Sequence, residues 1–184
     1  MATLSIFNFL SANGFFKGPN DDISWHLHGE EEGKFSDENS QGGNILLFGR
    51  KTFQMMESFW PTNQAKTMYP VTANGMNSAE KIVFSKTMKE AKWKNSRIMK
   101  DNLVEEVKKL KEGKINITIL GSGSIITQLA DHNLIDEYSL MIDPIFIGNG
   151  TSFVQNLQQN LRLKFKDSRV YKSGTVVLNY IKIE

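Results

Sequence analysis

Short apolar runs alternate with polar, helix-forming stretches through residue 147. Runs rich in Ile, Leu, Val or Phe predict buried strands at 4–10, 45–48, 81–85, 115–120 and 137–147, the last interrupted at Asp143-Pro144. Between these runs, the patterns predict helices at 30–39, from 52 to about 60, at 102–112 and at 124–134. Alternating strands and helices are typical of an α/β protein with a mainly parallel sheet.

The pattern changes towards the end of the chain. Residues 161–170 and 175–183 are β-rich, and Tyr171-Lys172-Ser173-Gly174 between them is typical of a hairpin turn. We therefore expect the sheet to end in a C-terminal antiparallel hairpin.

Two further segments have distinct local signals. Asn102 and Glu105 predict a capping box at the start of the helix 102–112, and Gly113 predicts its end. The stretch 61–78 is rich in Asn, Thr and small residues, which predicts a long irregular connection.

Composition limits the classes of function. The 184 residues fit a single domain, 1–184, and a hydrophobic fraction of 40% with 12 Phe is ample for a core. The net charge of +2 provides no broad field for nucleic acid or an anionic membrane, so we expect neither partner. The absence of Cys excludes disulfides, thiolate zinc sites and cysteine nucleophiles. With no signal-peptide pattern and no apolar run of spanning length, we expect a cytoplasmic protein.

A small-residue turn follows the strand at 115–120 and opens directly into a helix. Gly121 and Gly123 permit backbone conformations and close approaches that a Cβ forbids, and the amides of a helix start attract anions. The dinucleotide fingerprint requires a third glycine where Ile126 stands, so an ordinary Rossmann site is disfavoured and a plain connection remains an alternative. A second junction of the same kind, 49–52, follows the apolar run 44–48. Together, the two junctions predict a site for one extended, multiply charged ligand.

Several motifs resemble one family along the whole chain. They are Gly49-Arg-Lys-Thr-Phe53, Lys81-Ile-Val-Phe-Ser-Lys-Thr87, Leu120-Gly-Ser-Gly-Ser124, Leu134-Ile-Asp-Glu-Tyr138, Pro144-Ile-Phe-Ile-Gly-Asn-Gly150 and Lys172-Ser-Gly-Thr-Val-Val177. In these motifs the chain resembles the dihydrofolate reductase superfamily, and within it the stand-alone proteins similar to the C-terminal reductase domain of the bifunctional riboflavin biosynthesis enzyme. The resemblance implies a mixed, mainly parallel eight-stranded sheet flanked by helices, and NADPH as cofactor.

The resemblance also implies roles for the two junctions. Arg50 would pair with the 2′-phosphate of NADPH, whose geometry a guanidinium matches, although a solvated surface position is the alternative. Thr52 would bind the pyrophosphate. The full set of implied cofactor-binding residues is Gly49, Arg50, Lys51, Thr52, Ser85, Lys86, Gly121, Ser122, Gly123, Ser124 and Ile125, with Ile125 beside the nicotinamide ribose and Lys51 expected to be exposed.

The proton donor is less clearly indicated. In folate enzymes a carboxylate follows a Trp by a few residues, so Glu30 and Glu31 after Trp25 are the candidates, with a solvated acidic turn as the alternative. The riboflavin-type branch carries Asp before the glycine that ends its first strand, whereas this chain has Asn13, which cannot exchange a proton near neutral pH. A catalytic role for Asn13 and a structural turn role both remain open.

The remaining site predictions concern substrate and metal. Phe9, Asn13 and Trp25 are the predicted substrate-binding residues. His26 and His28 lack a nearby carboxylate in the sequence, which favours incidental loop histidines, and we expect no metal.

These observations lead to one principal hypothesis. The protein is expected to be an NADPH-dependent reductase of a small pteridine, pyrimidine or related carbonyl or imine substrate. Dihydrofolate reductase proper and a non-catalytic nucleotide-binding protein of the same fold are the alternatives. The apolar residues at 142–153 and the β-rich tail also predict a homodimer.

Overall fold

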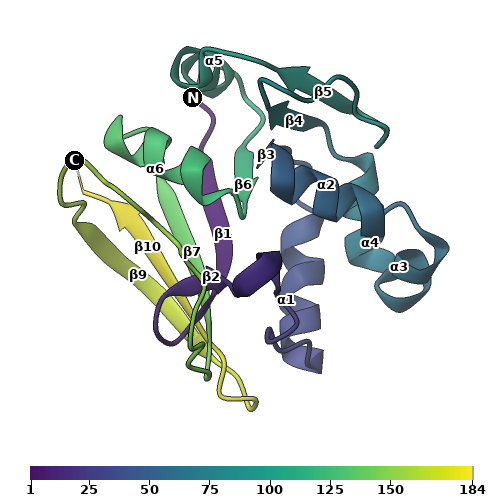
Figure 1. Ribbon diagram of the computed structural model, residues 1–184, viewed down its shortest axis with the longest axis vertical. Coiled ribbons are helices and arrows are strands. Elements are labelled where there is room, and N and C mark those ends of the chain that lie inside the picture. The colour runs from purple at the N-terminus through teal and green to yellow at the C-terminus, as the bar shows by residue number, and fades with distance from the viewer. Residues whose placement is uncertain (184) are drawn as a thin grey trace.

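In the computed structural model, which describes residues 1–183, eight strands form one mixed sheet (Figure 1). Six strands are mutually parallel, and the last two add an antiparallel hairpin at one side. Their order is β5 (Ser96–Met99), β4 (Lys81–Phe84), β3 (Ile45–Gly49), β6 (Ile117–Leu120), β1 (Leu4–Ser11), β7 (Glu137–Asp143), β10 (Val176–Lys182) and β9 (Leu163–Val170). This arrangement confirms the predicted fold class. Two short strands, β2 (Phe15–Lys17) and β8 (Thr151–Ser152), pair separately.

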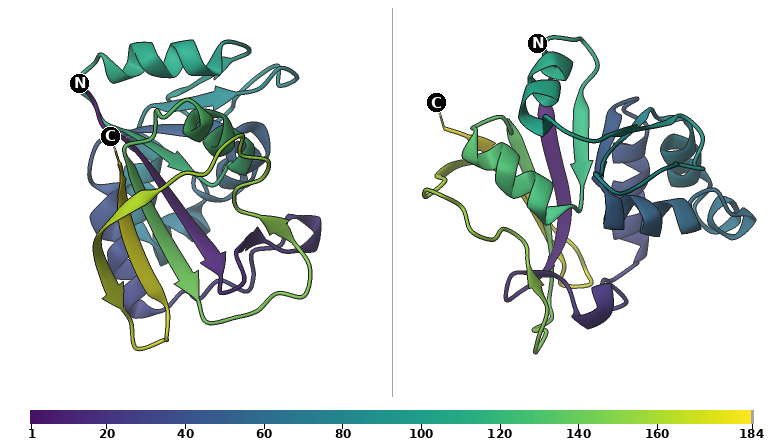
Figure 2. Two further views of the ribbon diagram at one scale, coloured as in Figure 1. Left: turned by 90° about the vertical axis from the view of Figure 1, so that its left-hand side faces the viewer. Right: turned by 45° about the horizontal axis from the view of Figure 1, so that its top comes forward.

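Helices cover both faces of the sheet (Figures 1 and 2). On one face, α5 (Leu103–Lys111) and α6 (Gly123–Asp131) contribute Val107 and Ile126 to a buried cluster with Leu4, Ile6 and Leu47. The other face carries α1 (Glu30–Ser40), α2 (Arg50–Phe59) and α4 (Pro70–Ser78), while α3 (Asn63–Met68) links α2 to α4 and the short helix η1 (Pro19–Asp21) precedes α1.

The apolar strand β3 is buried on both faces, which explains its continuous hydrophobic run. Leu47 packs towards α5 and α6, whereas Phe48 meets Phe53 of α2 and Trp93 with ring centroids 6.0 and 6.2 Å apart. Both Leu47 and Phe48 are fully buried. A central parallel strand has no solvent face, so a run of apolar residues predicts it without alternation.

The prediction of an irregular connection at 61–78 is wrong, because two helices occupy this stretch. Thr62 caps α3, its Oγ1 accepting the Ala65 N–H at 3.1 Å, and Pro70 begins α4. Threonine at a cap and proline at the first helical position are both helix-start signals. The small and polar residues of this stretch therefore serve helix starts and close packing rather than loop structure.

The predicted capping box at Asn102 is also wrong. Asn102 has a left-handed backbone with φ of +60°, and its side chain makes no cap bond to the helix that begins at Leu103. A capping side chain requires an extended backbone at its own residue, whereas Asn tolerates the left-handed region.

Asp136, just before β7, joins three parts of the fold. Its Oδ2 accepts the backbone N–H of Leu4 at 2.8 Å and contacts Lys111 Nζ, while Oδ1 lies 2.9 Å from Lys182 Nζ. Burial opposes ionisation of this carboxyl, but the bonds from Leu4, Lys111 and Lys182 outweigh it and lower the pKa.

A carboxylate with a lowered folded pKa stabilises the protein above its unfolded pKa and loses that contribution as pH falls through the folded value. We therefore expect Asp136→Asn to lose about 2 kcal/mol of unfolding free energy at pH 7. In urea unfolding measured from pH 7 downwards, the difference in unfolding free energy between the wild type and the variant should disappear below the ordinary Asp pKa of 3.8. A difference that is independent of pH would contradict this role.

Candidate functional site

The two glycine junctions predicted from the sequence meet at one edge of the sheet. Strands β3 and β6 are parallel neighbours, so α2 and α6 begin side by side at their carboxyl ends. The Gly49 N–H donates to Ser122 Oγ at 2.8 Å, and Ser122 Oγ donates to the Leu120 carbonyl at 3.2 Å. A Cβ on Gly121 would lie only 3.0 Å from Thr52 Cγ2, so the two junctions are in direct contact.

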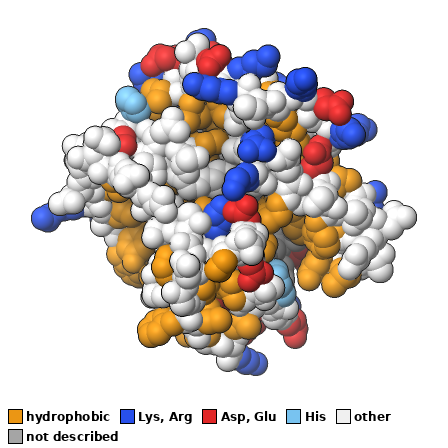
Figure 3. Space-filling view, viewed as in Figure 1, with side chains coloured by type: hydrophobic (Ala, Val, Ile, Leu, Met, Phe, Trp, Pro, Cys, Tyr) orange, Lys and Arg blue, Asp and Glu red, His pale blue; other side chains and the backbone are white. Residues whose placement is uncertain are grey.

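The contacting junctions leave two helix starts available for an anion. Within residues 1–183, no side-chain cap bond is made at the start of either α2 or α6. Gly121 and Ser122 are consecutive left-handed residues, with φ of +57° and +63°. Uncapped first-turn amides carry positive partial charge and bind phosphate well. Figure 3 shows basic side chains along the middle of the face where both helices begin in Figure 1.

Arg50 and Lys51, the first residues of α2, have different surroundings. Arg50 is exposed and makes one long bond, 3.3 Å, to Gln54 Oε1. Lys51 Nζ instead lies 3.2 Å from Asp21 Oδ2 of η1. Hydrogen bonds from Lys17 and then Lys51 lower the pKa of Asp21. Lys51 therefore ties η1 to α2, while the guanidinium of Arg50 remains open to a ligand.

The other predicted cofactor residues lie around the same edge. Ser85 is buried after β4 and its Oγ accepts the Met88 N–H at 3.0 Å, while Lys86 beside it is exposed. Ile125 is buried behind the junction, with its Cδ1 3.5 Å from where a Gly49 Cβ would be. The structure thus gathers all the predicted residues at one edge, with the Ser85 hydroxyl used in a turn. The cleft at this edge is also lined by Gly121, Ser122, Gly123 and Ser124.

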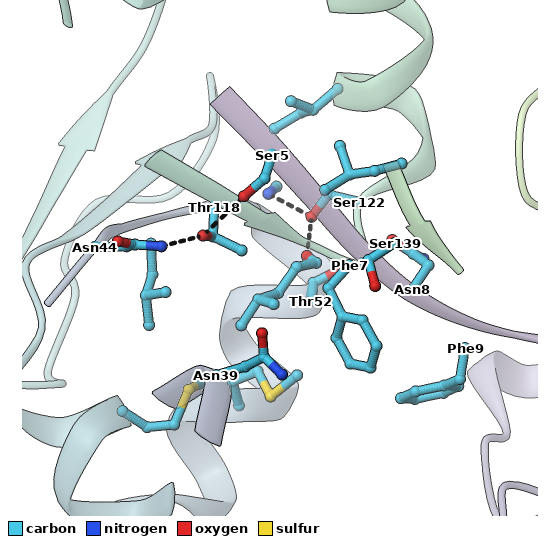
Figure 4. A pocket seen from close by; sticks show the side chains of 18 of the residues that line it. Ser5, Phe7, Asn8, Phe9, Asn39, Asn44, Thr52, Thr118, Ser122 and Ser139 are labelled. Atoms are coloured by element: carbon cyan, nitrogen blue, oxygen red, sulfur yellow. Dashed lines mark hydrogen bonds between the residues drawn. The ribbon is translucent and has the colours of Figure 1, made fainter. Parts of the chain in front are cut away.

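The cleft extends from the junctions along the sheet face beside α1. Its volume is about 2700 Å³, and Phe7 and Phe9 of β1 line it together with Thr52 and Ser122 (Figure 4). Pockets for single small ligands measure roughly 300–1,000 Å³. The cleft can therefore hold an extended ligand and a second, smaller molecule.

The predicted substrate residues lie in different places. Phe9 lines the cleft, whereas Trp25 is not among the lining residues and packs its ring edge-on to Phe9, with centroids 5.9 Å apart. Asn13 is exposed, and its amide bridges two loops: Oδ1 accepts from Ser11 Oγ at 2.8 Å and from the Ile147 N–H at 3.1 Å, and Nδ2 donates to the Ile147 carbonyl at 2.8 Å. This geometry matches the structural alternative for Asn13.

The predicted catalytic glutamates lie outside the cleft lining. The Glu30 side chain is 82% exposed and pairs with Lys34, and Glu31 Oε2 accepts the Lys172 N–H at 2.8 Å. The neighbouring Glu32, which the sequence prediction overlooked, is buried and lines the cleft.

Glu32 could have been found from its helical spacing. It stands three residues before Phe35, and both side chains lie on the buried side of α1. Burial opposes the ionisation of Glu32, but hydrogen bonds from Ser173 Oγ and from its own backbone outweigh burial and lower its pKa. Glu32 is therefore a charged group on the wall of the cleft.

The expectation that His26 lacks an organising carboxylate is wrong. His26 is buried, its Nδ1 lies 2.8 Å from Oδ2 of the fully buried Asp143, and its ring stacks on Phe9 at 4.1 Å. Asp143 is 117 residues away in sequence, so local pattern gives no signal for this pair. Among residues 1–183, no three His, Cys, Asp or Glu side chains are grouped to hold a metal.

Comparisons with known proteins place this chain in a family. The family model described as the RibD C-terminal domain matches residues 2–177. The chain is 32% identical over 173 residues to an uncharacterized protein, YyaP, of Bacillus subtilis strain 168, covering 93% of this chain and 90% of that protein.

Two solved structures share the fold. One is a putative riboflavin biosynthesis protein from Shewanella sp. PV-4, with a TM-score of 0.78, 21% identity and full coverage of both chains. The other is a pyrimidine reductase-like protein from Corynebacterium diphtheriae, with a TM-score of 0.67 and 13% identity, covering 100% of this chain and 92% of that one.

The helices of residues 1–183 are all too short or too polar to cross a membrane. The fold agrees with the resemblance to the dihydrofolate reductase superfamily seen in the sequence, and the family match extends over nearly the whole chain. This protein is therefore a member of the RibD C-terminal domain family.

Proposed function

We propose that this protein is an NADPH-dependent reductase of a small heterocyclic or imine substrate. Its family indicates a reductase-type function. The observation that carries the proposal is the contact between the two junctions, through the Gly49 N–H on Ser122 Oγ and the close approach of Gly121 to Thr52. This contact brings two helix starts together at the head of a large cleft, where their amides would bind one anion.

The residues at this edge fit the proposed cofactor. Thr52 and the amides of 121–124 would hold the pyrophosphate, and Arg50 would hold the 2′-phosphate that distinguishes NADPH from NADH. Ser85 and Lys86 would lie along the adenosine side. NADPH supplies a hydride when bound, and the protein must orient the substrate and provide a proton.

The rest of the cleft suits a flat substrate. Phe7 and Phe9 present aromatic surface there, and Ser139, which pairs in register with Phe7 on the neighbouring strand, adds a buried hydroxyl without a hydrogen bond within residues 1–183. Aromatic walls with a few polar atoms are typical of sites for planar heterocycles. We favour a ribosylamino-pyrimidine over dihydrofolate as the substrate. The two similar solved structures are a putative riboflavin biosynthesis protein and a pyrimidine reductase-like protein.

Arg50→Ala tests the cofactor assignment. Loss of charge-assisted bonds to the 2′-phosphate should weaken NADPH binding by about 10- to 100-fold and leave NADH binding unchanged. Calorimetric titration of the wild type and the variant with both nucleotides measures the difference. Arg162→Ala removes an exposed guanidinium outside the cleft and should bind as the wild type does. A wild type that prefers NADH, or binds neither nucleotide, would refute the proposal.

A non-catalytic nucleotide-binding protein is the second candidate. It is favoured by the positions of Glu30, Glu31 and Asn13, whose side chains are engaged outside the cleft lining. Oxidation of NADPH with dihydrofolate or with 5-amino-6-(5-phosphoribosylamino)uracil, followed by absorbance, separates these functions. The expected result is turnover of the pyrimidine.

The homodimer predicted from the sequence is tested separately by light scattering. A monomer in solution would exclude it.

A further inference from the structure

The buried His26 and Asp143 form a pair with defined hydrogen bonds. Asp143 is the last residue of β7 and is fully buried, and its two carboxylate oxygens contact different groups. Oδ1 accepts the Leu27 backbone N–H at 2.9 Å, and Oδ2 lies 2.8 Å from His26 Nδ1. A carboxylate at Nδ1 requires the proton on that nitrogen, so it sets both the tautomer and the orientation of the ring.

The second ring nitrogen is available to a ligand. No protein group within residues 1–183 hydrogen-bonds to His26 Nε2. The ring lies flat on Phe9, with an interplanar angle of 6°, and both residues line the cleft. Phe9 continues β1 beyond Phe7, which faces the junction that would hold the cofactor (Figure 4). The pair is therefore placed in the part of the cleft left for the substrate.

We propose that His26 is the proton donor of the reduction and that Asp143 positions its imidazole. This inference rests on the proposed reductase function. The carbon of a substrate C=N bond gains the hydride supplied by NADPH, and the π electrons move to nitrogen. That nitrogen takes the Nε2 proton of imidazolium, which leaves an amine, NADP⁺ and a neutral His26 that regains a proton from water.

Other ionisable groups near His26 are less suited to this role. Glu32 of α1 interacts electrostatically with His26, but its lowered pKa keeps it an anion. The ring of His28 lies 4.7 Å from that of His26 in the same loop, and burial, followed by the charge of His26, lowers the pKa of His28. Asp143 from β7 has both oxygens occupied. His26 is therefore the group that combines a fixed ring with a place on the cleft wall beside Phe9.

Nitrogen NMR of the histidines tests the pair without any turnover. The chain has three histidines, so His28→Gln and His132→Gln assign the signals. We expect neutral His26 to carry its proton on Nδ1 in the wild type, and Asp143→Asn to shift the proton towards Nε2. The inference would be overturned if neutral His26 of the wild type carried its proton on Nε2.

Single-turnover kinetics test the donor role, with NADPH-loaded protein and 5-amino-6-(5-phosphoribosylamino)uracil as the probe. We expect His26→Gln to be about 100-fold slower at pH 7 with unchanged NADPH affinity, and Asp143→Asn about 10-fold slower. The wild-type rate should fall as pH rises, whereas the residual rate of His26→Gln should not. His132→Gln, at the exposed end of α6, should match the wild type.

The outcomes separate the two proposals. Thermal unfolding shows whether each variant is folded, and Asp143→Asn, which preserves side-chain size, covers the case in which His26→Gln does not fold. A folded His26→Gln with the wild-type rate overturns the donor role and leaves the reductase function intact. A wild type that does not bind NADPH, or binds it without reducing the probe, refutes the proposed reaction, and the NMR result then still decides whether the pair exists.

Discussion

Gly121→Ala is expected to cost about 3 kcal/mol of unfolding free energy and to weaken NADPH binding about 10-fold. Gly121 has a φ of +57°, a conformation that costs an alanine about 1–2 kcal/mol. The added Cβ would also lie 3.0 Å from Thr52 Cγ2 and 3.1 Å from Thr52 Oγ1. Either Thr52 or the turn must move, and each movement disturbs the amides proposed to hold the pyrophosphate. Urea unfolding and nucleotide titration measure the two effects.

Gly43→Ala is the matched control for this substitution. Gly43 has a similar φ of +64°, but a Cβ there meets nothing within 4 Å. Gly43→Ala should therefore lose only the backbone-conformational part of the unfolding free energy, about 1–2 kcal/mol. Adding Thr52→Ser to Gly121→Ala removes the methyl group in closest contact and should recover part of the stability. Equal losses at Gly43 and Gly121 would show that the contact between the junctions contributes little.

Gly75→Ala is expected to destabilise the protein by about 3 kcal/mol, although alanine normally favours a helix. Gly75 lies in α4, where it packs against the end of α1. An added Cβ would overlap the carbonyl oxygen of Ser40 and lie 2.9 Å from its carbonyl carbon. Backbone cannot rotate out of the way as a side chain can, so the two helices must separate. Loss of this contact also shifts α1, whose Glu32 and Phe35 line the cleft.

Gly33→Ala provides the opposite result in a neighbouring helix. Gly33 lies within α1, and a Cβ there meets nothing within 4 Å. We expect a gain of about 0.5–1 kcal/mol, because alanine loses less backbone entropy than glycine in a helix. Chemical unfolding of the two variants under one condition should give changes of opposite sign. Changes of the same sign would contradict the helix contact at Gly75.

The sequence was most informative where local structure and function use the same residues. Gly121 and Gly49 mark sharp strand-to-helix junctions, and the apolar runs before them identify buried parallel strands. Because parallel strands place their carboxyl ends at one edge, the meeting of the two junctions could be anticipated. The helices at 63–78 were missed, since Thr62 and Pro70 are helix-start signals that also occur in loops.

The sheet strands other than β5, the C-terminal hairpin and the two glycine junctions were determined by the sequence alone, because periodicity and backbone freedom act over a few residues. The tertiary structure alone decided which glutamate lines the cleft and which carboxylate meets His26. Of three consecutive glutamates, the rotation of α1 against the sheet buries Glu32 and leaves Glu30 in solvent. Asp143 reaches His26 only because β7 lies beside β1 in the sheet, and such pairing depends on the packing of the whole chain.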